Sequence, residues 1–441
     1  MNIVDMAQSC VKCAKCVPSC TIYQIHRDES TSPRGFVDLL ALCEKGDLSL
    51  DKNLKDIFES CFLCTTCTTQ CPAQIDTATM IIKSRIAIAK KFGISFYKRA
   101  FFFLLRHRKL MDFVFSLTHF IAPCAFKGDD DRLRSRFALS KFGKRTIFPF
   151  AKKSFLNKYK NYKFSAESRG DSAKNALDSA GCGVRDSANP KKVAIFIGCL
   201  SNYNYTQVGD SLIHILERLN ISAIIPKQEC CGAPAFFTGD IKTVAHLIKK
   251  NIVLFEGFWD EIDAMIIPEA TCAAMIIKDW KHALEFSDLD DKSAWIARLE
   301  RLLPKIYMAS DYLQNHTNLP NLLKNAPKKT DKITYHDPCH AKKVLGLYKE
   351  PRALISTNYE IVEMGECDRC CGFGGVTMQS QKYEFAHSAG AAKAKHIAES
   401  SANIVSAECG ACRMQLNNAM DNNGVNTRFK HPLELIDKAL G

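Results

Sequence analysis

Four cysteines recur at one fixed interval, and this repeat constrains the fold more than any other feature of the chain. Each has a second cysteine 140 residues further on, in the pairs Cys199 and Cys339, Cys230 and Cys370, Cys231 and Cys371, and Cys272 and Cys412. Four coincidences at a single offset indicate an internal repeat. The C-terminal part of the chain is therefore expected to fold as two similar units. Cys409 breaks the register, because Glu269 stands at its equivalent position.

The hydrophobic pattern of both repeats alternates between strands and helices. Runs typical of buried strands occur at 193–197, 221–225, 264–267, 333–335, 359–362 and 402–405. Helical patterns lie between them, including one over 381–399. This alternation predicts two α/β domains with small parallel sheets, and such sheets bind ligands beyond the carboxyl ends of their strands. The repeated cysteines follow the strands, so they are expected to converge there.

A different cysteine pattern occupies the first 82 residues. Two runs share the spacing Cys-x-x-Cys-x-x-Cys-x-x-x-Cys, namely Cys10, Cys13, Cys16 and Cys20, then Cys61, Cys64, Cys67 and Cys71. This spacing is typical of two [4Fe-4S] cubanes in which the fourth cysteine of each run ligates the other cluster. We therefore expect one cubane on Cys10, Cys13, Cys16 and Cys71, and the other on Cys61, Cys64, Cys67 and Cys20. A pair of zinc knuckles is the alternative.

The residues between these two runs carry a helical pattern at Phe36, Leu39, Leu40 and Leu42. The pattern predicts a helical ferredoxin domain with its two clusters in the middle. Cys43 lies on the same helix and is expected to be a small buried side chain and not a ligand.

The second repeat contains five candidate ligands, which are Cys339, Cys370, Cys371, Cys409 and Cys412. Five thiolates suit a cluster of several irons better than one tetrahedral ion. The first repeat offers four, Cys199, Cys230, Cys231 and Cys272, with Glu269 at the fifth position. Buried structural cysteines are the alternative interpretation of both sets.

Two histidines stand near the second set. His340 follows Cys339 and is expected to donate a hydrogen bond that tunes a cluster. His336 is interpreted as a structural histidine of the core. Cys367 is left out of the ligand set because its counterpart in the first repeat is Lys227.

Positive charge is concentrated in one segment between the two halves of the chain. Residues 83–163 hold twenty-one Lys and Arg against four acids, a balance of +17, whereas the whole chain carries +13. Residues 83–126 are expected to be helical, with many Phe residues among the basic ones. The segment is interpreted either as core helices with a solvated basic face or as a surface for anionic lipid. No nucleic-acid partner is expected, because no reader fold accompanies the charge.

Several short motifs together resemble a known family. Gly198-Cys199, the Cys230-Cys231-Gly232 stretch, the Tyr335–His340 stretch and the Cys370–Gly375 stretch resemble the duplicated CCG domains of the heterodisulfide reductase B type. With the two N-terminal runs, the order is similar to the iron–sulfur subunit of glycolate oxidase and to the C subunit of anaerobic glycerol-3-phosphate dehydrogenase. The resemblance implies cysteine-bound [4Fe-4S] clusters in the CCG domains, of the cubane or the non-cubane kind. It implies one such cluster in the second repeat and leaves a fourth, in the first repeat, open.

The resemblance also implies a function. We expect an electron-transfer subunit without catalytic residues of its own, which accepts electrons from an FAD-containing dehydrogenase acting on glycolate or D-lactate and passes them toward the membrane quinone pool. A glycerol-3-phosphate dehydrogenase C subunit and a heterodisulfide-reductase-like thiol–disulfide reductase are the alternatives.

The length of the chain fits several domains, and the helical N-terminal part with the two α/β repeats makes a multidomain α+β protein the expected fold class. Its 441 residues are 46% hydrophobic, and no apolar run is long enough to span a bilayer. The start lacks the pattern of a secretory signal, so a cytoplasmic protein is expected, either free or peripheral on the inner face of the membrane. The expected domains are a ferredoxin domain (1–82), a basic aromatic segment with a linker (83–190), a first CCG domain (191–330) and a second (331–441).

Overall fold

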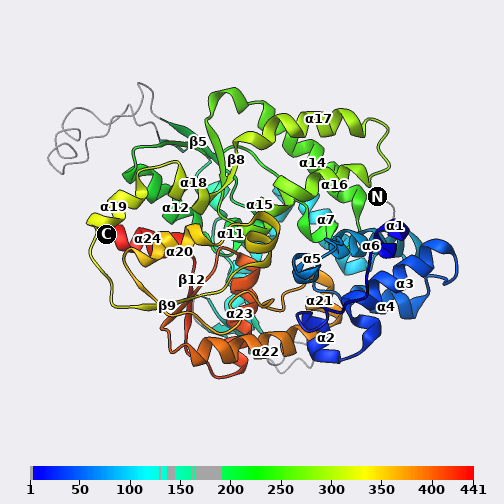
Figure 1. The fold of residues 1–441 in the computed structure, drawn as a ribbon. Helices are drawn as coiled ribbons and strands as arrows, with labels where there is room; N and C mark the ends of the chain where they lie inside the picture. Colours follow the sequence, from blue (N-terminus) through cyan, green and yellow to red (C-terminus); the bar gives the residue numbers. More distant parts are fainter. Residues whose placement is uncertain (1–2, 129–130, 137–144, 161, 165–190) are drawn as a thin grey trace.

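The computed structural model describes residues 3–128, 131–136, 145–160, 162–164 and 191–441. Most of the expected linker, residues 165–190 with Cys182, lies outside the described residues. The mixed α+β architecture is confirmed, and three coloured regions can be followed in Figure 1: a blue helical domain, a green to yellow α/β unit and an orange to red α/β unit.

The N-terminal domain is helical, as expected. Its elements are α1 (Ile3–Gln8), α2 (Thr21–His26), η1 (Glu29–Thr31), α3 (Pro33–Lys45), α4 (Lys52–Glu59), α5 (Thr66–Gln70) and α6 (Thr77–Phe92). Helix α3 shows why the chain folds this way locally. Ser32 caps its start by accepting a hydrogen bond from the Gly35 N–H, Pro33 occupies the first turn, and Gly46 ends it with a φ of 82°. Helix α6 continues past residue 82, where the domain boundary was expected.

The basic segment begins with two helices and continues as short strands. These are α7 (Phe96–Arg106), α8 (Arg108–Ala125), β1 (Phe126–Gly128), β2 (Leu133–Ser135), β3 (Thr146–Ile147), α9 (Phe155–Lys158) and β4 (Lys163–Phe164). Strands β1, β2 and β3 form an antiparallel sheet. The helices were expected from the sequence, and the strands were not.

The first repeat is an α/β unit around one sheet of order β4-β6-β5-β7-β8, in which only β4 runs antiparallel. Its strands are β5 (Lys192–Ile195), β6 (Ser222–Ile224), β7 (Ala264–Ile267) and β8 (Ile306–Met308). Its helices are α11 (Cys199–Tyr203), α12 (Gln207–Arg218), α13 (Ala233–Phe236), α14 (Ile241–Glu256), η3 (Trp259–Glu261), α15 (Ala270–Ala274), η4 (Met275–Asp279), α16 (Trp280–Glu285), α17 (Lys292–Leu302), η5 (Leu303–Lys305), α18 (Ala309–Asn315) and α19 (Leu319–Asn325).

The second repeat has a parallel sheet of order β10-β9-β11-β12. Its strands are β9 (Lys332–Tyr335), β10 (Glu360–Ile361), β11 (Ile404–Ser406) and β12 (Arg428–Lys430). Its helices are η6 (His340–Leu345), α20 (Lys349–Ser356), α21 (Gly375–Gln381), α22 (Tyr383–Glu399), α23 (Gly410–Asn422) and α24 (Pro432–Leu440). All six strands expected from the sequence are present, whereas β8 and β12 were missed.

The two repeats share one hydrophobic core. Buried residues of both sheets, such as Val193 and Ile333, belong to the same cluster as Leu433 of α24. Helix α24 packs against α12 of the first repeat. This packing fixes the two cysteine sets relative to each other.

Candidate iron–sulfur centres

The eight N-terminal cysteines gather into two groups. Cys10, Cys13, Cys16 and Cys71 line one cavity, and Cys20, Cys61, Cys64 and Cys67 line another. The fourth cysteine of each run thus lies with the first three of the other run. We call the first group the outer site and the second the inner site. Four thiols around one cavity fit a [4Fe-4S] cubane.

A buried arginine joins the inner site to the first repeat. Arg85 of α6 donates to the carbonyl oxygen of Cys61 at 2.6 Å and to that of Phe237 at 2.8 Å. Burial lowers the pKa of Arg85, and the neighbouring Cys61 thiol opposes that shift. A cation held beside the cysteines suits a site that carries negative charge.

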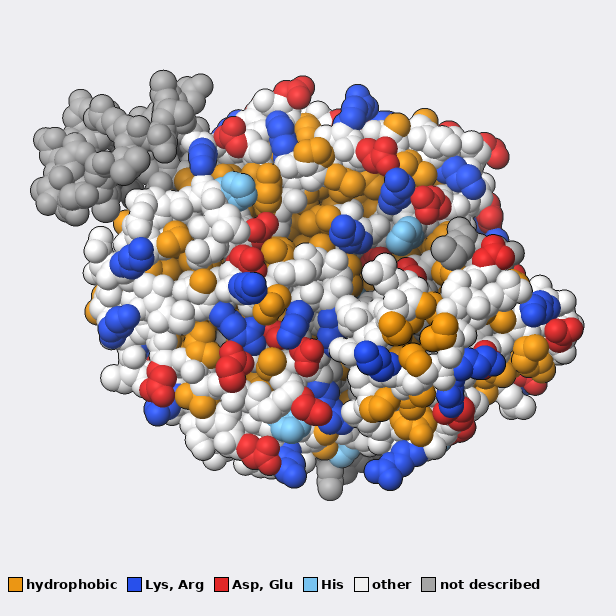
Figure 2. Space-filling model, in the orientation of Figure 1, with side chains coloured by type: hydrophobic (Ala, Val, Ile, Leu, Met, Phe, Trp, Pro, Cys, Tyr) orange, Lys and Arg blue, Asp and Glu red, His pale blue; other side chains and the backbone are white. Residues whose placement is uncertain are grey.

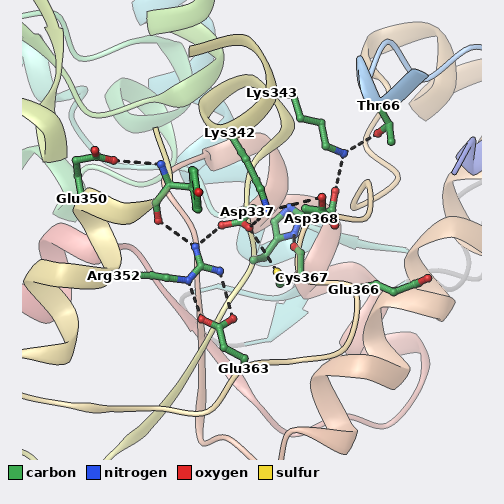
Figure 3. A network of polar contacts seen from close by, with 12 residues as sticks. Thr66, Asp337, Lys342, Lys343, Glu350, Arg352, Glu363, Glu366, Cys367 and Asp368 are labelled. Carbon is green, nitrogen blue, oxygen red and sulfur yellow. Dashed lines mark hydrogen bonds and ion pairs between the residues drawn. The ribbon is translucent and has the colours of Figure 1, made fainter. Parts of the chain in front are cut away.

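The loop of the inner site docks on the second repeat. The thiol of Cys64 lies close enough to the thiol of Cys370 for that neighbour to raise the pKa of Cys64 well above its usual value. Lys343 donates to the Thr66 hydroxyl at 2.6 Å and to the Asp368 carbonyl at 2.7 Å, so it bridges the two loops (Figure 3). A Cβ on Gly374 would lie 2.8 Å from the Phe62 ring, and the glycine therefore leaves room for this contact. The inner site and the second-repeat site adjoin directly.

The five cysteines of the second repeat come together at the expected edge of the sheet. Cys371 and Cys412 lie 3.4 Å apart, and the hydroxyl of Thr271 from the first repeat lies 3.5 Å from Cys409. A hydrogen bond from Cys412 lowers the pKa of Cys409 to about 7, although burial opposes the shift. The exposed fraction of Cys370, Cys371, Cys409 and Cys412 is 5% or less. Neighbouring thiols and burial instead raise the pKa of Cys370 and Cys412. The four thiols are sheltered and lie together, as ligands of one cluster must.

Cys367, which was not predicted to be a cluster ligand, forms a hydrogen bond with a carboxylate instead. Its thiol donates to the Asp337 carboxylate at 3.4 Å. The same carboxylate accepts from Lys342 at 2.8 Å and from Arg352, and these partners surround it in Figure 3. They hold the pKa of Asp337 below its usual range although burial opposes this. The network supports the loop that carries Cys370.

His336 and His340, the two histidines nearest the second-repeat cysteines in the sequence, occupy different environments. His340 stacks on Phe237 with ring centroids 5.4 Å apart, and its Nδ1 lies 3.3 Å from the Thr271 hydroxyl and 3.9 Å from the Cys339 sulfur. His336 is buried directly after β9. From the sequence, we expected His340 to tune a cluster. The structure places His340 between the two repeats, beside the ligand set.

The four cysteines of the first repeat form a second sheltered group. The thiols of Cys199, Cys230, Cys231 and Cys272 lie close enough together for each to shift the pKa of its neighbours. Gly198, with a φ of 73°, precedes Cys199, and a Cβ there would lie 2.9 Å from the Cys272 sulfur. Only glycine fits both this left-handed conformation and this approach.

Glu269 does not point at these four cysteines as a fifth ligand. Its carboxylate accepts a hydrogen bond from the Gly410 N–H at 2.7 Å and another from the Ser201 hydroxyl. Burial raises the pKa of Glu269, and the hydrogen bonds from Gly410 and Ser201 oppose that shift. The position that holds a thiolate in the second repeat is a contact between repeats in the first.

Arg108 is a residue of the first-repeat site that sequence reasoning missed. It was counted in the basic surface, yet its guanidinium is buried over the Tyr203 ring, 5.2 Å from the centroid, and interacts electrostatically with Cys199 and Cys230. Its Nε and Nη2 atoms have no hydrogen-bond partner among the described residues. Unpaired donors on a buried cation fit an anionic cluster on these thiolates. Nothing in the local sequence distinguishes Arg108 from its exposed basic neighbours.

Several other basic residues of the segment contact the CCG repeats. Arg134 pairs with Asp421, Lys158 pairs with Asp210 at 2.9 Å, and Lys98 donates to Thr377 at 2.9 Å. The face drawn in Figure 2 shows blue and red side chains interspersed, without one large basic surface. An apolar face nevertheless remains on α7 and α8, where the exposed side chains are Phe96, Tyr97, Phe103, Leu110, Phe113, Leu117, Phe120 and Ile121.

Comparison with known proteins agrees with this architecture. Residues 6–75 match the 4Fe-4S dicluster domain, and residues 193–277 and 333–417 each match the cysteine-rich CCG domain. The chain joins a 4Fe-4S dicluster domain to a duplicated CCG domain. This arrangement binds [4Fe-4S] clusters and identifies the chain as an iron–sulfur electron-transfer subunit of the oxidoreductase type.

Relatives with curated names include proteins of lactate metabolism. Lactate utilization protein A 2 of Bacillus cereus (strain Q1) is 28% identical over 252 residues, which is 56% of this chain and 99% of the relative. Lactate utilization protein A of Geobacillus thermodenitrificans is 29% identical over 250 residues, 56% of this chain and 98% of the relative. A fumarate reductase (CoM/CoB) subunit of Methanothermobacter marburgensis is 29% identical over 272 residues, 60% of this chain, and the match spans half of that relative.

Proposed function

We propose that this subunit carries electrons from a partner FAD-containing dehydrogenase of a 2-hydroxy acid, lactate or glycolate, toward the membrane quinone pool. The observation that carries the proposal is the proximity of the Cys64 thiol of the inner site to the Cys370 thiol of the second repeat, which raises the pKa of Cys64. It places the inner site next to the second-repeat site, and the crossed positions of Cys20 and Cys71 tie the outer site to the inner one through the chain. Bound [4Fe-4S] clusters would supply one-electron transfer between these sites.

The residues of the chain prepare these sites for electron transfer. Cysteines of each set are held around a common cavity or hydrogen-bonded to one another, so little reorganisation is needed. Arg85 and Arg108 place buried positive charge beside the inner and first-repeat sites. Four of the five second-repeat thiols are almost fully buried and Cys339 is half-buried, which favours a relay over direct attack on a disulfide substrate. The thiol–disulfide reductase alternative therefore has less support.

The substrate of the complex is proposed from the relatives named for lactate utilization. The test is to purify the native complex anaerobically and add D-lactate, L-lactate, glycolate or glycerol 3-phosphate in turn. One of the hydroxy acids should bleach the iron–sulfur absorption near-stoichiometrically, and the co-purified subunit should contain FAD. Bleaching by glycerol 3-phosphate alone would replace the hydroxy-acid assignment with the glycerol-3-phosphate alternative.

We further propose that α7 and α8 rest on an anionic membrane surface. No helix among the described residues is long and apolar enough to cross a membrane. The exposed face includes Phe113, 65% exposed, and Phe120, 65% exposed, and exposed Lys109 lies on the same helix. Apolar side chains with adjacent cations suit the headgroup boundary of a bilayer.

Liposome sedimentation tests this surface. The double variant Phe113→Ser, Phe120→Ser should weaken binding to anionic vesicles, and Val253→Ser, a change at an exposed apolar residue of α14, should not. Arg108 is unsuitable for charge reversal because it is buried beside Cys199. Equal binding of wild type and the double variant would contradict the membrane assignment of this face.

A further inference from the structure

His336 stands at an unusual point of the second repeat. It directly follows β9 and is 1% exposed, and its counterpart in the first repeat is Phe196, which is also 1% exposed. A histidine used only to fill the core would be expected to satisfy both ring nitrogens, because an unpaired buried polar atom costs free energy.

Among the described residues, only one ring nitrogen of His336 has a hydrogen-bond partner. Nδ1 lies 3.2 Å from the carbonyl oxygen of Cys367. A carbonyl oxygen can only accept, so Nδ1 carries the hydrogen of the neutral ring and Nε2 presents a lone pair. Nε2 is buried and has no hydrogen-bond partner among the described residues.

The cysteines nearest to this ring belong to the ligand set. A ring nitrogen of His336 and the sulfurs of Cys371 and Cys412 all lie within 4.8 Å of one another. Histidines that bind metals commonly donate their other ring N–H to a backbone carbonyl, which fixes the tautomer and the ring orientation. His336 has this arrangement, with the Cys367 carbonyl as the fixing group.

We propose that His336, through Nε2, is a nitrogen ligand of the iron–sulfur centre of the second repeat. The inference rests on the proposed function in that it requires a cluster on these cysteines. It replaces the interpretation of His336 as a core histidine. It also makes the two repeats unlike in a second respect, because Phe196 offers no ligand atom where His336 offers one.

A neutral imidazole bound to iron adds less negative charge than a thiolate does. Histidine ligation raises the reduction potential of iron–sulfur centres relative to all-cysteine ligation. The second repeat is therefore expected to hold the centre that accepts electrons more readily than the first. Electrons arriving from the inner site would settle there.

The test uses the full chain with its clusters reconstituted anaerobically. The protein is labelled with 15N-histidine, and pulsed electron paramagnetic resonance is recorded on the reduced signal that the Cys412→Ala variant lacks. Wild type should show a 15N hyperfine coupling that is lost in His336→Phe, the residue of the first repeat. The matched variant His340→Phe should keep it, since His340 stacks on Phe237 outside the proposed ligand set. His336→Gln serves as a second variant should the phenylalanine disturb folding.

Two results would overturn the inference. One is a histidine coupling that persists in both His336 variants, and the other is a wild-type signal without any histidine coupling. A wild-type protein that lacks the Cys412-dependent signal and the corresponding four irons would overturn the cluster assignment itself. Iron content measured on the same samples separates that failure from failure of the histidine ligand alone.

Discussion

The Glu269 carboxylate accepts a 2.7 Å hydrogen bond from the backbone N–H of Gly410, the residue that follows Cys409. Glu269 and Cys409 occupy equivalent positions of the two repeats, so the fifth ligand position of one repeat has become a support for the ligand loop of the other. A Cβ on Gly410 would lie 2.9 Å from the carboxylate, and glycine is therefore needed for this contact.

Replacing Glu269 should separate its structural role from ligation. Glu269→Leu leaves the buried Gly410 N–H without an acceptor and should lower the free energy of unfolding by about 1–3 kcal/mol. Glu269→Gln keeps an acceptor and should cost less. Thermal unfolding of the two variants measures the stability change. Iron content, measured on the same samples, should be the same in Glu269→Gln and wild type. A loss of four irons in the Gln variant would show that Glu269 is a ligand after all.

Arg108 should tune the first-repeat site. Arg108→Leu removes a buried positive charge near Cys199 and Cys230, so the cluster there should become harder to reduce, by an amount on the order of tens of millivolts. Redox titration followed by electron paramagnetic resonance measures this shift. Arg99→Leu, a change at an exposed residue of α7, is the matched control and should leave every potential unchanged. Equal potentials in Arg108→Leu and wild type would show that the guanidinium does not act on a cluster.

The grouping of the N-terminal cysteines predicts which cluster each residue serves. Cys20 lies with Cys61, Cys64 and Cys67, so Cys20→Ala should damage the cluster of the inner site and spare that of the outer site. In Cys71→Ala, electron paramagnetic resonance should show loss of the outer-site signal while the inner-site signal remains. Loss of the outer-site signal in Cys20→Ala would refute crossed ligation.

Glu408 should give the protein a stability that falls as pH rises. Burial raises the pKa of Glu408 to about 8, and the Ser310 hydroxyl donates to it at 3.0 Å. Above its unfolded pKa, near 4.5, the unfolded state releases a proton that the folded state keeps. Stability should therefore decline toward pH 8, by about 1.4 kcal/mol per pH unit at most. Glu408→Gln should flatten this slope in thermal unfolding between pH 5.5 and 8, and an unchanged slope would contradict it.

Much of this architecture could be predicted from the sequence because cysteine spacing and strand patterns are local. The 140-residue offset between cysteines predicted the two repeats. The alternation of strand and helix patterns predicted the positions of β5, β6, β7, β9, β10 and β11. Strand β12, Arg428–Lys430, was missed because it contains a single apolar residue, and β8, Ile306–Met308, was missed because it lies directly between the helices η5 and α18. The short strands of the basic segment depend on contacts with the second repeat, such as the Thr146 N–H bonded to Asn418 at 3.0 Å.

Relations between distant residues could not be predicted. Arg108 and exposed Lys109 are consecutive residues of one basic stretch. Only tertiary packing turns the Arg108 side chain toward Cys199. The orientation of His336 depends on the Cys367 carbonyl, 31 residues away. The contact of Cys64 with Cys370 joins two domains, so no spacing rule could indicate it.

That contact supports the central claim, which is that the inner site passes electrons directly to the second repeat. Electron paramagnetic resonance of the fully reduced protein tests it most directly, because adjoining paramagnetic clusters broaden and split each other's spectra. The repeat supplies a matched pair of variants, Cys412→Ala for the second site and Cys272→Ala for the first. The splitting that the second-repeat centre imposes on the inner-site signal should disappear in Cys412→Ala, leaving only the coupling to the outer site, and should persist in Cys272→Ala. An inner-site spectrum that is the same in wild type and Cys412→Ala would contradict the account.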